Sequence, residues 1–302
     1  MPDDLRQRLG ELKQERNAVI LAHNYQRPEV QDAADITGDS LGLSRQAAKT
    51  DADVILFCGV HFMAETAAII CPDKTVLIPD KHAGCPMADM VTARELQNAK
   101  DEHPDAAVVC YVNSTAEIKA MSDLCCTSAN AVAVVDSIPS DREVLFVPDQ
   151  SLGSWVAKQL GRALILWPGY CPTHHRIIAE HVRAAKAAHP DAEVVVHPEC
   201  LDEVCELADC VASTSGMLAH CRESGVEQFI IGTESGMLHP LKKQNPEKEF
   251  FAASPLSDCP NMKLNTVEKM VWALEDMQYR VEVPADVAGR ARAAIDAMLA
   301  IG

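Results

Sequence analysis

VILAHNY (residues 19–25) is the first of three apolar runs that end in polar residues, and the other two are VVCYVNS (108–114) and VVVHPEC (194–200). Each run is typical of a parallel strand that is buried on both faces and carries polar groups at its carboxyl end. His23, Tyr111 and His197 occupy equivalent places in the three runs, at separations of 88 and 86 residues. A repeat of this period predicts three copies of one structural unit.

Further landmarks recur in the same order and at the same period. Small hydroxyl residues, which are good helix N-caps, open three helix-like stretches, and they are Ser40, Ser128 and either Ser213 or Thr214. Three more apolar strands follow, DVILFCG (53–59), EVLFVPD (143–149) and EQFIIGT (227–233). Each unit then ends with a strand, a loop and a Cys-Pro pair, whose cysteines are Cys85, Cys171 and Cys259.

Each copy therefore reads as β–α–β–α–β–α–β, with a short second strand. AVAVV (131–135) has the composition of a strand, but its place in the repeat predicts a helix. Alternating strands and helices imply a parallel sheet with helices on both faces. The predicted fold class is α/β, with three pseudo-symmetric three-layer α/β/α units, each with a four-stranded parallel sheet, around a central active site. The expected units are residues 1–104, 105–190 and 191–302, the last with two C-terminal amphipathic helices.

The composition fits a globular protein and argues against several functional classes. The chain has 302 residues and a net charge of −17, whereas nucleic-acid and anionic membrane surfaces attract clustered Lys and Arg. No run approaches the roughly 20 apolar residues that cross a bilayer, and the charged N-terminus has no apolar signal-peptide core. We therefore expect a cytoplasmic protein without a membrane or nucleic-acid partner. Its twelve cysteines are expected to stay reduced, and most of them to be buried and inert.

The three cysteines of the Cys-Pro pairs are the expected exception. Thiolates bind soft metals and iron–sulfur clusters. Electron-transfer clusters commonly take four cysteine thiolates, whereas the repeat supplies three. The pattern predicts that Cys85, Cys171 and Cys259 hold one [4Fe–4S] cluster per chain, with a fourth iron left open as a Lewis acid suited to dehydration. Zinc is the alternative metal, with His174 as a fourth ligand. A hydro-lyase of the aconitase type and a three-cysteine sensor without enzyme activity also stay open as functions.

Polar residues at the predicted strand ends supply candidate catalytic and binding groups. Glu199 is the strongest candidate for a general acid or base, and Tyr25 could exchange a proton or orient a substrate. The hydroxyl residues named above lie where helix N-termini face the expected cavity, and such helix ends bind carboxylate or phosphate. Lys81 and Lys263 fit loop residues that serve solvent or structure.

Ten motifs along the chain resemble those of the quinolinate synthase family. They are AHNYQRPEVQDAADITGDSLGLS (22–44), CGVHFMAETA (58–67), IPDKHAGCPMADM (78–90), YVNSTAEIKA (111–120), CTSAN (126–130), WPGYCPTH (167–174), HPEC (197–200), ASTSGM (212–217), IGTESGMLH (231–239) and CPNMKLNT (259–266). The resemblance spans nearly the whole chain. It implies three pseudo-symmetric α/β units around a [4Fe–4S] cluster with three cysteine ligands, in agreement with the repeat.

The resemblance also implies a reaction and a set of partners. The family condenses iminoaspartate with dihydroxyacetone phosphate, with loss of phosphate and two waters, to give quinolinate for NAD biosynthesis. The expected partners are these two small molecules, aspartate oxidase as a source of iminoaspartate, and the iron–sulfur assembly machinery that builds the cluster.

The functional residues of the family, carried over motif by motif, fall on defined positions of this chain. Catalytic roles are expected for Tyr25, Glu199, His23 and Tyr111. Substrate contacts are expected from His23, Ser40, Tyr111, Asn113, Ser128, His174, His197, Glu199, Ser213 and Thr214. The chain departs from family members that carry CxxCxxC around the third ligand, because Cys259 is followed by Pro-Asn-Met-Lys. This chain therefore lacks the two additional cysteines of that motif, and they cannot act as a redox switch here.

Overall fold

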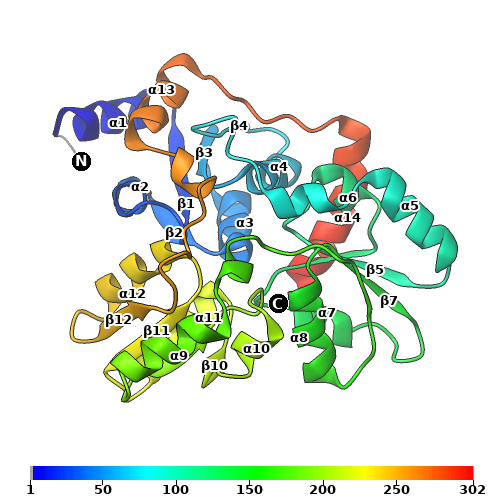
Figure 1. Cartoon of the computed structure of the whole chain (residues 1–302). Coiled ribbons are helices and arrows are strands. Elements are labelled where there is room, and N and C mark those ends of the chain that lie inside the picture. The colour runs from blue at the N-terminus through cyan, green and yellow to red at the C-terminus, as the bar shows by residue number, and fades with distance from the viewer. Residues whose placement is uncertain (1–2, 302) are drawn as a thin grey trace.

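A computed structural model describes residues 3–301, and these form three four-stranded parallel sheets, one in each copy of the repeat (Figure 1). In every sheet the first strand of the unit lies between the second and the third, and the fourth pairs with the third. The strands are β1 (Ala18–His23), β2 (Ile36–Gly38), β3 (Val54–Cys58), β4 (Thr75–Leu77), β5 (Ala107–Tyr111), β6 (Leu124–Cys126), β7 (Val144–Val147), β8 (Ile165–Leu166), β9 (Glu193–Val196), β10 (Cys210–Val211), β11 (Gln228–Gly232) and β12 (Glu249–Ala252). The predicted α/β fold with three repeated units is confirmed.

Helices alternate with these strands and flank each sheet (Figure 1). The α-helices are α1 (Asp3–Glu15), α2 (Pro28–Ala33), α3 (Ser40–Lys49), α4 (His61–Ile70), α5 (Ala93–Glu102), α6 (Ala116–Ala120), α7 (Ala131–Asp136), α8 (Gln150–Leu160), α9 (Ala179–Ala188), α10 (Asp202–Cys205), α11 (Thr214–Glu223), α12 (Leu238–Gln244), α13 (Val267–Asp276) and α14 (Ala285–Ile301). The 3-10 helices within residues 3–301 are η1 (Pro86–Met90), η2 (His174–Arg176), η3 (Ser235–Met237) and η4 (Met262–Leu264). In the part of the chain that the structure describes, no helix is both long and apolar enough to cross a membrane.

The central strands are apolar along their length because both faces of each sheet are covered. Every residue of β3, β5 and β7 is buried, so these strands read as continuous apolar runs without alternation. AVAVV forms α7, as its place in the repeat predicts. The helix begins at Ala131, however, and Ser128 lies in the turn before it, where a helix start was expected.

Local signals at the helix ends account for several element boundaries. Thr92 and Glu95 form a capping box at the start of α5, in which each side chain bonds the backbone N–H of the other residue. Asp149 caps α8 by accepting a hydrogen bond from Leu152 N. Gly161 ends the same helix with φ of 59°, a left-handed conformation that favours glycine.

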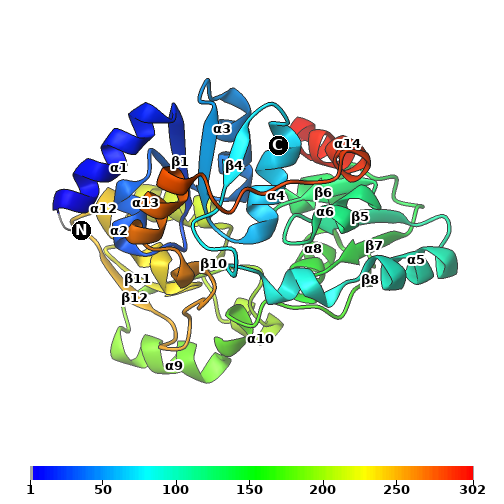
Figure 2. The ribbon, with the colours of Figure 1, turned by 90° about the horizontal axis from the view of Figure 1, so that it is seen from above.

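The two C-terminal helices follow the third sheet in the sequence but pack on the other two units. α13 lies beside α1, and α14 lies against α6 and β6 (Figure 2). Asn130, just before α7, donates a hydrogen bond to the carbonyl of Met298 in α14. The two C-terminal helices, which were grouped with the third unit by sequence, therefore pack on the first and second units. The unit boundaries at 104/105 and 190/191 stay predictions.

Candidate active site

The carboxyl ends of the strands of all three units surround a cavity of about 410 Å³. This volume lies within the roughly 300–1,000 Å³ typical of small-molecule sites. Among the described residues that line it are these members of the predicted site: His23, Tyr25, Ser40, Cys85, Tyr111, Asn113, Ser128, Cys171, His174, His197, Glu199, Thr214 and Cys259. Ser213 is not among the described lining residues, and its hydroxyl caps α11 by accepting a hydrogen bond from Gly216 N.

The three cysteines of the Cys-Pro pairs meet in this cavity as free, half-buried thiols. Each is followed by a short 3-10 helix, and each cysteine carbonyl accepts a hydrogen bond from the backbone N–H three or four residues later. Burial, with a contribution from Cys259, raises the pKa of Cys85 to about 12. Burial, Glu199 and Cys85 likewise raise the pKa of Cys171. The three thiols thus line one cavity as protonated groups, which a metal centre would deprotonate.

The polar strand ends of the first and third units share one local geometry. The His23 Nδ1 atom accepts a hydrogen bond from Tyr25 N at 3.2 Å, and His197 Nδ1 accepts one from Glu199 N at 3.3 Å. This bond leaves the opposite ring nitrogen of each histidine, Nε2, for other partners. His197 Nε2 lies 3.1 Å from the Ser128 hydroxyl, which belongs to the second unit. The repeat seen in the sequence therefore extends to hydrogen bonding.

Glu199 is the centre of a buried polar network between the second and third units. Its carboxylate accepts hydrogen bonds from the Tyr111 hydroxyl and, at 3.3 Å, from Asn113 Nδ2. His174 Nδ1 lies 2.8 Å from the other carboxylate oxygen. Burial by itself raises the pKa of Glu199, but His174 and the Tyr111 hydroxyl outweigh burial and hold it well below its usual value. A charged carboxylate is thus stabilised although its side chain is almost fully buried.

Thr233 joins Tyr25 to this network, although the sequence reading did not select it. Its hydroxyl lies 2.6 Å from the Tyr25 hydroxyl and 2.9 Å from His174 Nε2. A continuous hydrogen-bonded path thus runs from Tyr25 through Thr233 and His174 to Glu199. A signal was available in the repeat, because Thr233 ends its strand segment at the same place as Gly59 and Asp149 in the other units.

Asp149 is a second residue that this signal would have found. Its side chain is fully buried, and Oδ2 has no hydrogen-bond partner within residues 3–301. Burial, with a smaller contribution from Glu199, raises the pKa of Asp149 well above its usual value. Burial therefore favours the neutral acid, which caps α8 beside the site.

Two histidines and two tyrosines of the site have pKa values that favour their neutral forms. Burial lowers the pKa of His23 to about 4 and that of His197 to about 3. Burial, together with the charge on Glu199, raises the pKa values of Tyr25 and Tyr111 well above the usual value. At pH 7, His23 and His197 are therefore neutral imidazoles, and Tyr25 and Tyr111 are protonated phenols, near the Glu199 carboxylate.

The first and third units are also joined by the helix ends near the cavity. Asn24, at the end of β1, donates a hydrogen bond to the Thr214 hydroxyl at the start of α11, at 3.0 Å. Ser215 donates one to Asp39, the cap of α3, at 2.5 Å. These bonds bring the N-termini of α3 and α11 to the same side of the cavity.

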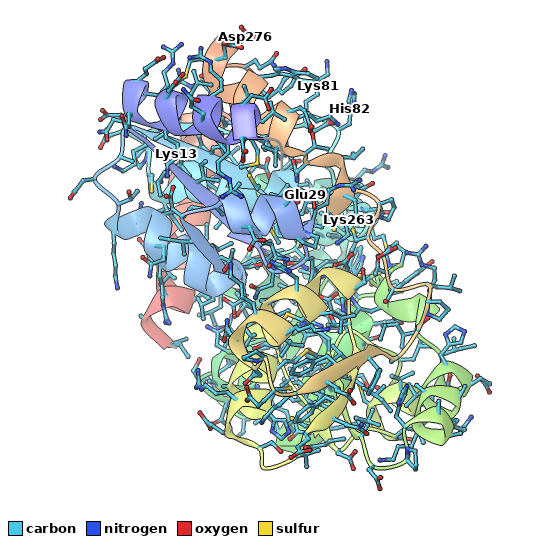
Figure 3. All side chains as sticks on the ribbon, turned by 90° about the vertical axis from the view of Figure 1, so that its left-hand side faces the viewer. Lys13, Glu29, Lys81, His82, Lys263 and Asp276 are labelled. Carbon is cyan, nitrogen blue, oxygen red and sulfur yellow. The ribbon has the colours of Figure 1, made fainter. Side chains whose placement is uncertain are left out.

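A buried ion pair between Glu234 and Lys263 lies next to Cys259, the third cysteine. Glu234 accepts a hydrogen bond from Cys259 N at 2.9 Å and pairs with Lys263 Nζ at 2.9 Å. Lys263 also donates to the Tyr25 carbonyl at 2.7 Å, so it links the Cys259 loop to the end of β1. Figure 3 shows Lys263 in the segment that follows Cys259, close to Glu29 of α2. Both side chains line a shallow hollow there. Lys263 therefore has a structural contact that the sequence alone did not indicate.

Replacing Lys263 by methionine is expected to lower the free energy of unfolding by about 3 kcal/mol, because it leaves the Glu234 carboxylate buried without its counter-charge. The Glu234 side chain is 1% exposed and that of Lys263 is 18% exposed. Lys243→Met is the matched control, because its ion pair with Asp32 is 64% and 42% exposed and is worth about 0–1 kcal/mol. Urea denaturation of the three proteins measures the difference, and equal midpoints for the two variants would contradict the expectation.

Comparison with known proteins assigns the chain to a family. A family model described as Quinolinate synthetase A protein matches residues 7–300. The chain belongs to the quinolinate synthase family. This membership confirms the resemblance drawn from the ten motifs, and with it the prediction that the chain is an enzyme.

Relatives named quinolinate synthase match along nearly their full length. One from Geobacter metallireducens is 58% identical over 299 residues, which cover 99% of this chain and 98% of the relative. One from Methanosarcina barkeri is 54% identical over 298 residues, with coverage of 99% and 98%. One from Pelobacter propionicus is 55% identical over 302 residues, with coverage of 100% and 99%. Among solved structures, one match is an E-1-hydroxy-2-methyl-but-2-enyl-4-diphosphate reductase from Plasmodium falciparum, with a TM-score of 0.31 and 13% identity. The match covers 93% of this chain and 87% of that chain, and a similarity this low supports no conclusion.

Proposed function

We propose that this chain condenses iminoaspartate with dihydroxyacetone phosphate to form quinolinate, with release of phosphate and two waters. The observation that carries the proposal is the meeting of three thiols, one buried carboxylate and two helix N-termini around one cavity, in a chain of the quinolinate synthase family. The product is expected to serve NAD biosynthesis.

The proposed cofactor is one [4Fe–4S] cluster held by Cys85, Cys171 and Cys259. The donor set fits this group, because the three thiols are free, come from three different units and line the same cavity, and no other cysteine is among its described lining residues. When bound, the cluster supplies an iron with an open coordination position, which acts as a Lewis acid on a substrate oxygen.

The proposed binding groups for the anionic substrates are the N-termini of α3 and α11. Both helices have ten residues and begin at the cavity with Ser40 and Thr214. Their free backbone N–H groups and positive dipole ends favour carboxylate and phosphate. The hydroxyl of Ser128 adds a third donor, which His197 orients. Ser213 would act through α11, whose cap it forms.

The proposed path for protons is the chain of hydrogen bonds from Tyr25 to Glu199. Glu199 is charged and can accept a proton, whereas Tyr25 and Tyr111 are neutral and can donate one. Thr233 and His174 connect the two ends, so a proton taken at one end of the cavity can be returned at the other. Tyr111 and Asn113 hold the carboxylate in place.

Thr233→Val is expected to reduce turnover by about 10-fold, because a methyl group replaces the hydroxyl that bridges Tyr25 and His174 and removes two hydrogen bonds, which leaves only the long direct contact of 3.5 Å between them. Thr233→Ser keeps the hydroxyl and is expected to retain most of the turnover. Steady-state kinetics of both variants, at equal iron content, measure the effect. Equal turnover in the valine and serine variants would remove Thr233 from the proton path.

An anaerobic experiment tests the proposed function directly. Iron and sulfide are measured per chain, and quinolinate is then assayed from dihydroxyacetone phosphate and freshly generated iminoaspartate. We expect four irons and four sulfides per chain, as the cluster formula requires, and quinolinate formation that depends on both substrates. Turnover of a hydroxy acid alone would favour the aconitase-type hydro-lyase, and metal binding without any product would favour the sensor.

The proposed partners follow from the same chemistry. An aspartate oxidase would supply iminoaspartate, and iron–sulfur assembly proteins would supply the cluster. We propose a cytoplasmic location, which the state of the cysteines supports, since all twelve are free thiols.

A further inference from the structure

Three ligand atoms of different chemistry lie together at one wall of the cavity. Cys171 Sγ, a histidine nitrogen of His174 and a carboxylate oxygen of Glu199 are all within 4.8 Å of one another. His174 Nδ1 lies 3.1 Å from the sulfur and 2.8 Å from the carboxylate oxygen. The His174 and Glu199 side chains are 1% and 4% exposed, so the group is shielded from bulk water.

These separations suit a single tetrahedral ion. Zinc binds sulfur at about 2.3 Å and nitrogen or oxygen at about 2.0–2.2 Å, which places the ligand atoms roughly 3–4 Å apart. The present contacts are those of hydrogen bonds, so shifts of about 0.5–1 Å would open the group to an ion of this size. Cys, His and Glu are the residue types that zinc prefers.

Two of the three ligands, His174 and Glu199, also have supporting contacts, as metal ligands commonly do. His174 Nε2 lies 2.9 Å from the Thr233 hydroxyl, which can accept the ring proton at Nε2 once an ion replaces that proton at Nδ1. Glu199 accepts hydrogen bonds from Tyr111 and Asn113 through its other oxygen. The site is therefore built in two layers.

We propose that the cluster-free chain binds one divalent ion of the zinc type through Cys171, His174 and Glu199. Three protein ligands leave a fourth position, which faces the cavity and takes water or a small anion. Binding releases the thiol proton of Cys171, while His174 binds as the neutral imidazole and Glu199 as the carboxylate. Because Cys171 is also a proposed cluster ligand, the ion and the cluster exclude each other. The ion site does not depend on the proposed reaction.

The test uses the full-length, cluster-free chain under anaerobic conditions. Zn²⁺ is titrated against a competing chelator, and Co²⁺ reports sulfur coordination and tetrahedral geometry by its absorption spectrum. We expect one ion per chain. His174→Gln and Glu199→Gln should each weaken Zn²⁺ binding by about 100-fold or more, since even outer partners of a metal ligand are worth about 10–100-fold.

Cys85→Ser and Cys259→Ser are the matched controls, because they remove a proposed cluster ligand but no ligand of the ion. Both should keep the Zn²⁺ affinity and the Co²⁺ spectrum of the unchanged chain, and both should fail to assemble a cluster. Loss of zinc binding in these two variants, with no change in the glutamine variants, would assign zinc to the three thiols and overturn the proposal.

Two measurements distinguish a loss of zinc ligands from unfolding of a variant. Circular dichroism and urea midpoints show whether each variant folds, and the isosteric Glu199→Gln variant decides the question if His174→Gln is unfolded. Unaltered Zn²⁺ affinity in a folded Glu199→Gln variant overturns the proposed ion site. Cluster assembly and quinolinate formation are measured separately on the unchanged chain. If the proposed function fails there, the zinc titration can still be interpreted.

Discussion

Cys171→Ala is expected to yield a colourless protein that makes no quinolinate. The three proposed cluster thiolates come one from each unit, and two thiolates leave a second iron of the cluster without a protein ligand. The chain has no nearby replacement, because the described lining of the cavity includes only Cys85 and Cys259 besides Cys171. Visible absorbance, iron content and quinolinate formation, all measured anaerobically, test this expectation.

Cys210→Ser is the matched control for this loss. Cys210 is a half-buried free thiol in β10 and does not belong to the described lining of the cavity. The control should keep the brown colour and the turnover of the unchanged chain. Full activity in a colourless, iron-free Cys171→Ala protein would refute the cluster-based function, while loss of activity in both variants would point to general damage.

The architecture could be predicted because its signal lies in the order and spacing of whole elements. Parallel strands that are covered on both faces need long apolar runs, and three such runs with polar ends recur at one period. The same period corrected the reading of residues 131–135, where strand propensity pointed the wrong way. Helix packing outweighs the propensity of Ala and Val there, since Val134 and Val135 are fully buried.

Contacts between the units could not be predicted in the same way. Thr233 meets Tyr25 across 208 residues of sequence, and Glu199 meets His174 from a different unit. Such contacts depend on how the sheets are placed relative to one another, which no local pattern records. The packing of α13 and α14 on the first two units is a further example, because an amphipathic helix shows that it packs but not on what.

The sequence also gave no sign of how the buried carboxylate keeps its charge. Glu199 was selected because it stands at a strand end, but its low pKa comes mainly from His174, which the second unit contributes, with smaller contributions from His197 and Tyr111. Lys263 was read as a loop residue that serves solvent or structure, but the sequence did not show its partner, the buried Glu234 next to Cys259. In both cases the group that stabilises a buried charge comes from another part of the chain, where pairing in three dimensions decides the outcome.

Glu199→Gln is expected to reduce turnover by about 10²–10⁴-fold, the range that a positioned general acid or base contributes. Glutamine has nearly the same shape and can still accept hydrogen bonds from Tyr111 and Asn113, so the change removes the charge and the proton-accepting oxygen rather than the network. The cluster should still assemble, because the three cysteines are untouched. Kinetics at equal iron content separate this chemical defect from a defect in cluster binding.

Glu193→Gln is the matched control, because Glu193 begins the same strand, β9, and pairs with His220 away from the cavity. It should leave turnover unchanged. If Glu199→Gln retained full turnover with its cluster in place, Glu199 could not be the group that moves protons, and Tyr25 or Tyr111 would have to do so without it. A protein that had lost both cluster and activity would instead show that the carboxylate holds the cavity in shape. The charge on Glu199 is therefore the feature on which the proposed proton path depends, and the iron-normalised rate of this single variant decides whether the path exists.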